Sequence, residues 1–62
     1  MDSKQIDNAM KKRTPVMWRG KKYDCILEYV MWYDTAGKRR LSAVLLEGRH
    51  TYRVPAEEVT EE

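Results

Sequence analysis

Few residues in this chain could perform catalysis or hold a metal. There is one cysteine, Cys25, and one histidine, His50. Structural zinc sites use four ligands that are mostly cysteine and histidine, so one chain does not assemble such a site. Cys25 lies in an apolar stretch, where a cysteine usually packs as a small hydrophobe, and His50 flanks a predicted turn. We therefore expect a protein that is not an enzyme and has no catalytic residues, no metal and no cofactor.

Basic and aromatic residues gather around a predicted hairpin and the turn after it. Two aromatic residues precede the turn of this hairpin, three basic residues follow it, and a further arginine lies in the next turn. Exposed aromatic and arginine side chains are typical of interface hot spots. The predicted partner-binding residues are Trp32, Tyr33, Lys38, Arg39, Arg40 and Arg49.

Two classes of macromolecule could recognise this surface. The first is a protein partner, including a second copy of the chain, because the large apolar side chains outnumber the places in one thin core. The second is single-stranded nucleic acid, because cations follow the phosphate backbone while rings stack on bases. Only nucleic-acid binding should weaken steeply with salt. We expect no small-molecule substrate, and no apolar run is long enough to cross a membrane.

The charge is distributed unevenly along the chain. Residues 1–56 hold all twelve lysines and arginines against six acidic residues, whereas residues 57–62 add four glutamates. A basic body could attract an anionic partner, and the acidic tail could screen that body from non-specific contacts.

Four predicted strands must position these side chains. They cover residues 14–18, 22–33, 39–46 and 51–54, and the three glycines all fall in the breaks between them. Glycine supplies the positive φ that tight turns require. Apolar residues occur on both faces of the second strand, which predicts a strong bend with a bulge. The predicted core comprises Val16, Tyr23, Ile26, Val30, Leu41, Ala43, Leu45, Tyr52, Val54 and Val59.

The two ends of the chain have distinct predicted roles. Residues 1–13 contain a short helix, with Ser3 as its N-cap and Ile6 and Ala9 on a narrow apolar stripe. Such a helix must dock on the sheet or fray. Residues 14–59 form the β domain, and residues 60–62 form a disordered acidic tail. A lone cysteine and a polar start favour a cytoplasmic location.

The order of strands, glycine turn, hairpin and final helical turn resembles the layout of SH3-like small barrels. The run Tyr52-Arg53-Val54-Pro55-Ala56-Glu57-Glu58-Val59 is similar to the close of such a barrel. The resemblance implies a mainly β fold, an SH3-like small barrel of four to five short antiparallel strands with a short N-terminal helix. The acidic loop and paired tyrosines of proline-peptide binders are missing, so that activity is not implied.

A second resemblance concerns the start of the β domain. The run Thr14-Pro15-Val16-Met17-Trp18-Arg19-Gly20, followed by Tyr23-Asp24-Cys25-Ile26, resembles short uncharacterised proteins of prophages and mobile elements of Gram-positive gut bacteria. This resemblance implies an accessory protein of a phage or mobile element and brings no established activity.

Overall fold

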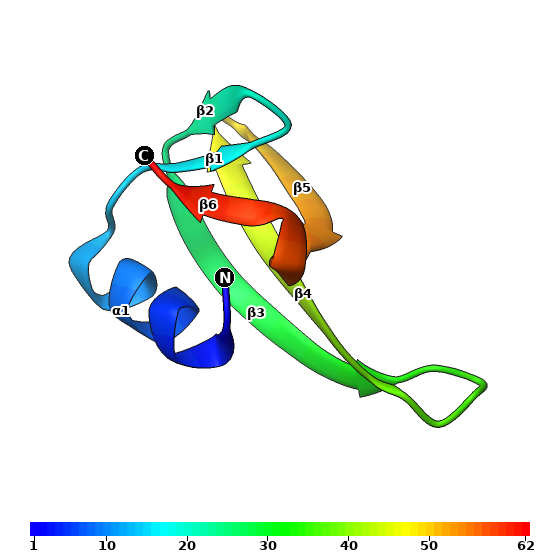
Figure 1. Ribbon diagram of the computed structural model, residues 1–62. Coiled ribbons are helices and arrows are strands. Elements are labelled where there is room, and N and C mark those ends of the chain that lie inside the picture. The colour runs from blue at the N-terminus through cyan, green and yellow to red at the C-terminus, as the bar shows by residue number, and fades with distance from the viewer.

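The computed structural model describes residues 1–62 as a mainly β protein with a short N-terminal helix (Figure 1). All strand pairs are antiparallel, and six strands are present instead of the four to five that the sequence predicts. The elements are α1 (Ser3–Lys12), β1 (Val16–Trp18), β2 (Lys21–Tyr23), β3 (Cys25–Tyr33), β4 (Arg39–Glu47), β5 (His50–Pro55), the 3₁₀ helix η1 (Ala56–Glu58) and β6 (Val59–Glu61).

The strands form two open three-stranded sheets, with orders β2-β1-β6 and β3-β4-β5, and no closed barrel. The chain passes from one sheet to the other at Asp24, which divides the predicted long strand into β2 and β3. The Asp24 backbone N–H donates to the Leu46 carbonyl at 2.8 Å, and its carboxylate accepts from the Gly48 N–H at 2.9 Å. These bonds explain the division, because the backbone at Asp24 turns toward β4.

A bulge bends β3 near its start. The pairing with β4 shifts between Ile26 and Glu28, so Leu27 has no partner. Cys25 and Ile26 are both buried, whereas Leu27 is 42% exposed. The predicted bulge is therefore confirmed, and it lets two consecutive side chains be buried.

The core lies between the two sheets and the helix. Seven predicted core residues are buried: Val16, Tyr23, Ile26, Ala43, Leu45, Val54 and Val59. Val30 and Leu41 are only half-buried. The prediction for Tyr52 is wrong, because this ring packs edge-on against Tyr23, with 5.7 Å between centroids, and remains 38% exposed. The space between the elements is filled instead by Ile6, Ala9 and Ala56.

The helix docks on β3 through its apolar stripe, so it is held by tertiary packing. Its N-cap is Asp2 and not Ser3, which is a correction of the prediction. The Asp2 carboxylate accepts from the Gln5 N–H at 2.8 Å, and the Gln5 side chain accepts from the Asp2 N–H at 3.0 Å. Because these two bonds form a capping box, they satisfy two donors at the helix start. The helix is too short to span a membrane.

The end of the chain is ordered as a strand. The prediction that residues 60–62 are disordered is wrong for Thr60 and Glu61, which belong to β6. Met17 pairs with Thr60, and Val16 pairs with Glu61. The edge of β1 supplies backbone partners for this segment, which its charged composition does not reveal.

Candidate functional site

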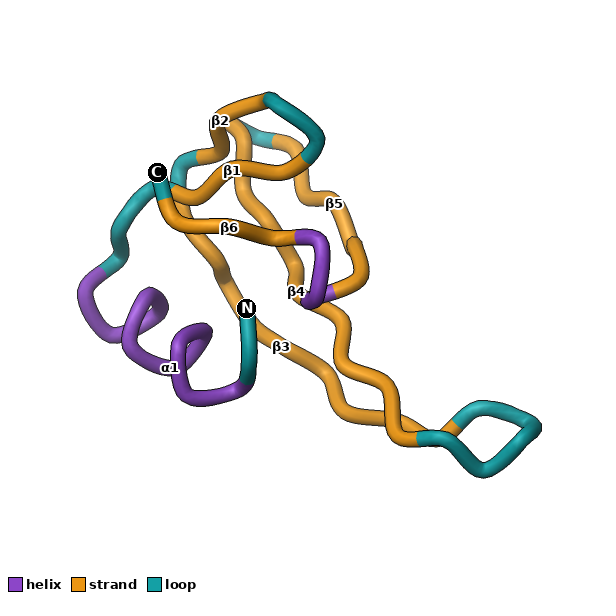
Figure 2. Tube along the Cα trace, in the orientation of Figure 1, coloured by secondary structure: helices purple, strands orange, loops and turns teal.

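The β3–β4 hairpin carries most of the predicted site, and its tip projects beyond the rest of the two sheets (Figures 1 and 2). Trp32 pairs with Arg40, and Tyr33 pairs with Arg39. Since paired residues share a face and successive residues alternate, Trp32 and Arg40 lie on one face and Tyr33 and Arg39 on the other. The structure thus brings together two aromatic–cation pairs on opposite faces of one hairpin.

Asp34 organises the hairpin turn. One carboxylate oxygen accepts from the N–H groups of Ala36 and Lys38, each at 2.9 Å. The other oxygen accepts from Arg40 Nε at 3.0 Å. The Lys38 N–H and then the Arg40 guanidinium hold the pKa of Asp34 below its ordinary value. The turn and the Arg40 side chain are therefore fixed by the same carboxylate.

A hydrogen bond to β4 fixes the position of the Trp32 side chain. Its indole N–H donates to Ser42 Oγ at 3.2 Å, and Ser42 is buried. The ring itself stays 40% exposed. Trp32 therefore presents a positioned aromatic surface to solvent, which lowers the entropic cost of using it in a contact.

The other face of the hairpin is apolar and open. Tyr33 is 64% exposed, the largest value among the exposed large hydrophobic residues. Met31 pairs with Leu41 and lies on the same face as Tyr33. Of the six exposed large hydrophobic residues, all but Tyr52 belong to β3. The surplus apolar surface of the protein is thus concentrated on one strand.

Carboxylates pair with the cations around the first turn. Lys21 pairs with Glu47 at 2.8 Å, and Lys22 pairs with Glu62 at 2.8 Å. Arg19 pairs with Glu58 at 3.2 Å. The hydrogen bond that Lys21 donates to Glu47 raises the pKa of Lys21. Every cation around the first turn therefore has an acidic neighbour.

The cations at the end of α1 do not extend the hairpin surface. Lys12 lines a hollow together with Glu61 and Glu62. Figure 1 shows α1 and the C-terminus on the side of the molecule away from the hairpin tip. The cations at the helix end and those of the hairpin therefore do not form one continuous positive surface. In contrast, Lys38 and Arg39 form no ion pair.

Arg49 lies apart from the other predicted site residues. It occupies the turn between β4 and β5, whereas the hairpin tip is at the other end of β4. The length of this nine-residue strand separates Arg49 from Arg39. The structure therefore gathers five of the six predicted partner-binding residues and leaves Arg49 outside the group.

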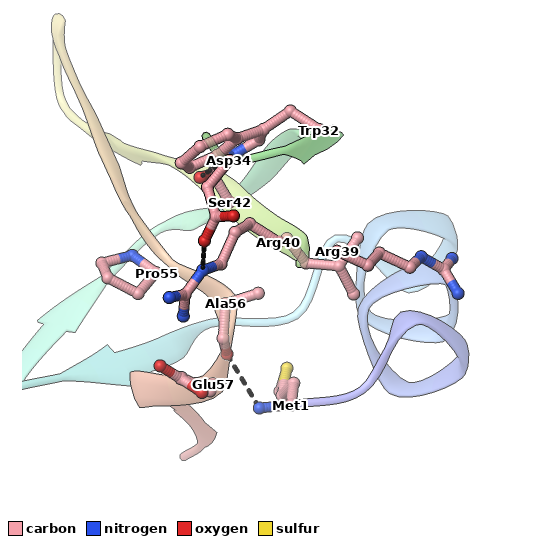
Figure 3. Close-up of a pocket in the computed structure, with 10 residues that line it drawn as sticks. Met1, Trp32, Asp34, Arg39, Arg40, Ser42, Pro55, Ala56 and Glu57 are labelled. Atoms are coloured by element: carbon pink, nitrogen blue, oxygen red, sulfur yellow. Dashed lines mark hydrogen bonds and ion pairs between the residues drawn. The ribbon is translucent and has the colours of Figure 1, made fainter. Parts of the chain in front are cut away.

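A hollow of about 440 Å³ lies at the base of the hairpin (Figure 3). Most of the residues that line it were not predicted from the sequence, because only the tertiary fold brings η1 and Met1 next to the hairpin. The Met1 amino group donates to the carbonyls of Ala56 and Val59, both at 2.9 Å. The lining residues are Met1, Trp32, Asp34, Arg39, Arg40, Leu41, Ser42, Pro55, Ala56 and Glu57.

No cluster of histidine, cysteine and carboxylate side chains has a geometry that could hold a metal ion. Cys25 is buried as a free thiol. Comparison with protein families, with curated sequences and with solved structures gives no match to this chain.

Proposed function

We propose that this protein is a small non-enzymatic interaction module that binds a protein partner through its β3–β4 hairpin. The observation that carries the proposal is the concentration of exposed apolar side chains on β3. Such a cluster loses contact with water when a partner covers it, and burial of apolar surface is the main driving force of association.

Two rings act as anchors in this proposal. Trp32 is positioned by Ser42, and Tyr33 extends into solvent beside Arg39. Aromatic and arginine side chains contribute most of the binding energy at many interfaces. Arg39 and Arg40 supply charge-assisted hydrogen bonds to acidic groups of the partner, Arg40 through its terminal Nη groups because its Nε is bonded to Asp34.

We further propose that the strands follow the topology of an SH3-like small barrel, with the two sheets left open. The sheet orders β2-β1-β6 and β3-β4-β5 support this topology, with β2 and β3 as two halves of one bent strand. The 3₁₀ helix η1 before the last strand also supports it. Residues 14–26 resemble mobile-element proteins, and on this basis we propose that the chain is a cytoplasmic accessory protein of a phage or mobile element.

Affinity capture tests the protein-partner proposal. The immobilised protein should retain a partner from a Gram-positive cell lysate at both low and high salt. Tyr33→Ser should lose that partner, because it removes the most exposed anchor. Tyr52→Ser is the matched control, since it removes another exposed tyrosine from outside the hairpin. Equal retention by wild type and Tyr33→Ser would contradict the proposed site.

A second candidate function is binding of single-stranded nucleic acid. The specific observation in its favour is that Tyr33 lies beside Arg39, which has no ion pair, next to the unpaired Lys38. A base could stack on the ring while the cations contact phosphates.

Fluorescence anisotropy with a labelled random oligonucleotide tests this second function. Binding should weaken steeply as salt rises, and replacing Lys38, Arg39 and Arg40 with alanine should abolish it. Unchanged anisotropy at low salt would rule against this function and leave the protein partner ahead.

A further inference from the structure

Part of the β4 edge has no strand beside it. The pairing of β4 with β5 begins at Glu47–His50 and ends at Ser42–Pro55. Beyond Pro55 the chain leaves the sheet and enters η1. Residues 39–41 therefore have β3 on one side and no strand on the other.

The alternation of backbone hydrogen bonds along the hairpin shows which N–H and C=O groups of β4 point to this open side. The Asp34 N–H donates to the Lys38 carbonyl at 3.0 Å, so the backbone of Lys38 points toward β3. Backbone groups of successive residues in a strand point to opposite sides. The N–H and C=O groups of Arg39 and Leu41 therefore point toward the position that β5 vacates.

The hollow described above lies along this open edge. Pro55 and Ala56 line it where β5 ends and η1 begins. Figure 3 shows the Arg39 side chain pointing away from that of Arg40. Leu41 and Ala56 give the side facing the core an apolar character, while Trp32 lines the opposite face. An extended chain three to four residues long, about 10 Å at the usual rise per residue, matches the length of the unpaired segment.

The charges along the hollow select both a partner and a direction. Arg39, toward the hairpin tip, has no ion pair, whereas Arg40 is already occupied by Asp34. Glu57 lies at the other end, in η1. An acidic side chain is therefore favoured beside Arg39 and disfavoured beside Glu57.

We propose that the open β4 edge binds an extended acidic peptide segment of a partner protein as an added strand. The segment runs antiparallel to β4, continuing the direction of β5. An apolar residue lies opposite Leu41, and an acidic residue two positions later lies opposite Arg39. Main-chain hydrogen bonds provide affinity and the alternate side chains provide specificity, as in other cases of strand addition.

This inference rests on the proposed protein-binding function and names the chemistry of the bound segment. The two ideas share Arg39 but otherwise depend on different residues. The apolar face of β3 uses Tyr33, whereas the added strand uses the backbone of residues 39–41 and the Arg39 side chain. Their failures can therefore be told apart.

The test uses a blocked synthetic peptide, acetyl-threonine-valine-threonine-glutamate-threonine-amide, with the isotope-labelled full chain. Amide NMR signals of Arg39, Leu41 and Ala56 should shift on titration, while those of the β4–β5 turn should not. A peptide methylated on the backbone nitrogens of valine and glutamate should bind at least about tenfold more weakly, since each opposed residue loses a hydrogen bond.

Charge reversal tests the register. Arg39→Glu should bind the glutamate peptide at least about tenfold more weakly and prefer the same peptide with lysine in place of glutamate. Arg49→Glu is the matched control, because it makes the same charge change at the other end of β4. Equal weakening by both variants would overturn the proposal, because it would indicate a general charge effect.

Two further outcomes separate the hypotheses. No amide shift with the wild-type chain, or shifts indifferent to backbone methylation, would overturn strand addition while leaving the β3 face as a binding surface. Tyr33→Ser should still bind the peptide even if it loses the captured partner. Binding of the peptide lost in Tyr33→Ser but unchanged in Arg39→Glu would also overturn the proposed register.

Discussion

The Trp32 indole N–H donates to Ser42 Oγ at 3.2 Å, from β3 to β4. Ser42 does not lie directly opposite Trp32, because its partner in the ladder is Val30. The bond is therefore diagonal, and it draws the ring along the strand over the serine. This arrangement buries a polar residue and orients an exposed ring with one contact.

Ser42→Ala should remove the only hydrogen-bond partner of the Trp32 indole. We expect a loss of about 1 kcal/mol in the free energy of unfolding, because the ring is partly exposed and water can replace the serine. Urea unfolding measures this loss. Thr60→Ala is the control for removal of a hydroxyl from an exposed strand position. A Ser42→Ala protein as stable as the control would mean that the bond contributes nothing.

Protonation of Asp34 should loosen the hairpin turn. Its pKa is lowered in the folded protein, first by the Lys38 N–H and then by Arg40. Its stabilising contribution is therefore complete above the ordinary aspartate pKa of about 3.9 and is lost as the pH falls through the lower folded value. NMR titration of the Lys38 and Ala36 amides should show this change. Asp34→Asn should remove it, because the amide does not titrate.

Ile6 is 0% exposed and fastens α1 to the rest of the core. Ile6→Ala should lower the free energy of unfolding by about 2–5 kcal/mol, which is the usual cost of removing a buried isoleucine. Ile6→Val should cost only about 0.5–1.5 kcal/mol. Urea unfolding followed by circular dichroism measures both. If Ile6→Ala lowered the free energy of unfolding by less than the range given for Ile6→Val, the docking of the helix would not depend on this contact.

The acidic end of the chain should restrain non-specific binding of nucleic acid. Glu58 and Glu62 pair with Arg19 and Lys22. Replacing both glutamates with glutamine should free these cations and strengthen oligonucleotide binding at low salt, with a steeper dependence on salt. Anisotropy titrations measure the effect.

The control for that experiment is Glu28→Gln. Glu28 lies in β3 and forms no ion pair. If Glu28→Gln strengthens oligonucleotide binding as much, per negative charge removed, as the double replacement does, the screening depends on net charge and not on the two ion pairs.

Local patterns were sufficient to predict most of the strand residues and part of the core. The alternation of Ala43 and Leu45 places both on one face of β4, and the structure buries both. Gly37 closes the hairpin with a φ of 79°, which is the left-handed conformation that glycine adopts most readily. These features can be predicted from the sequence because alternation and turns involve only residues that are close together along the chain.

Tertiary packing decided the remaining features. Tyr52 and Ile6 both have apolar side chains, but only Ile6 meets a space that its side chain fills. Thr60 and Glu61 become a strand because β1 presents a free edge to them. Arg19 and Glu58 are 39 positions apart and still pair. Contacts of this kind depend on how distant segments are brought together. The local sequence therefore determined the helix, most of the strand residues and the turns, while the fold decided the last strand and which charges and which edge remain free to bind.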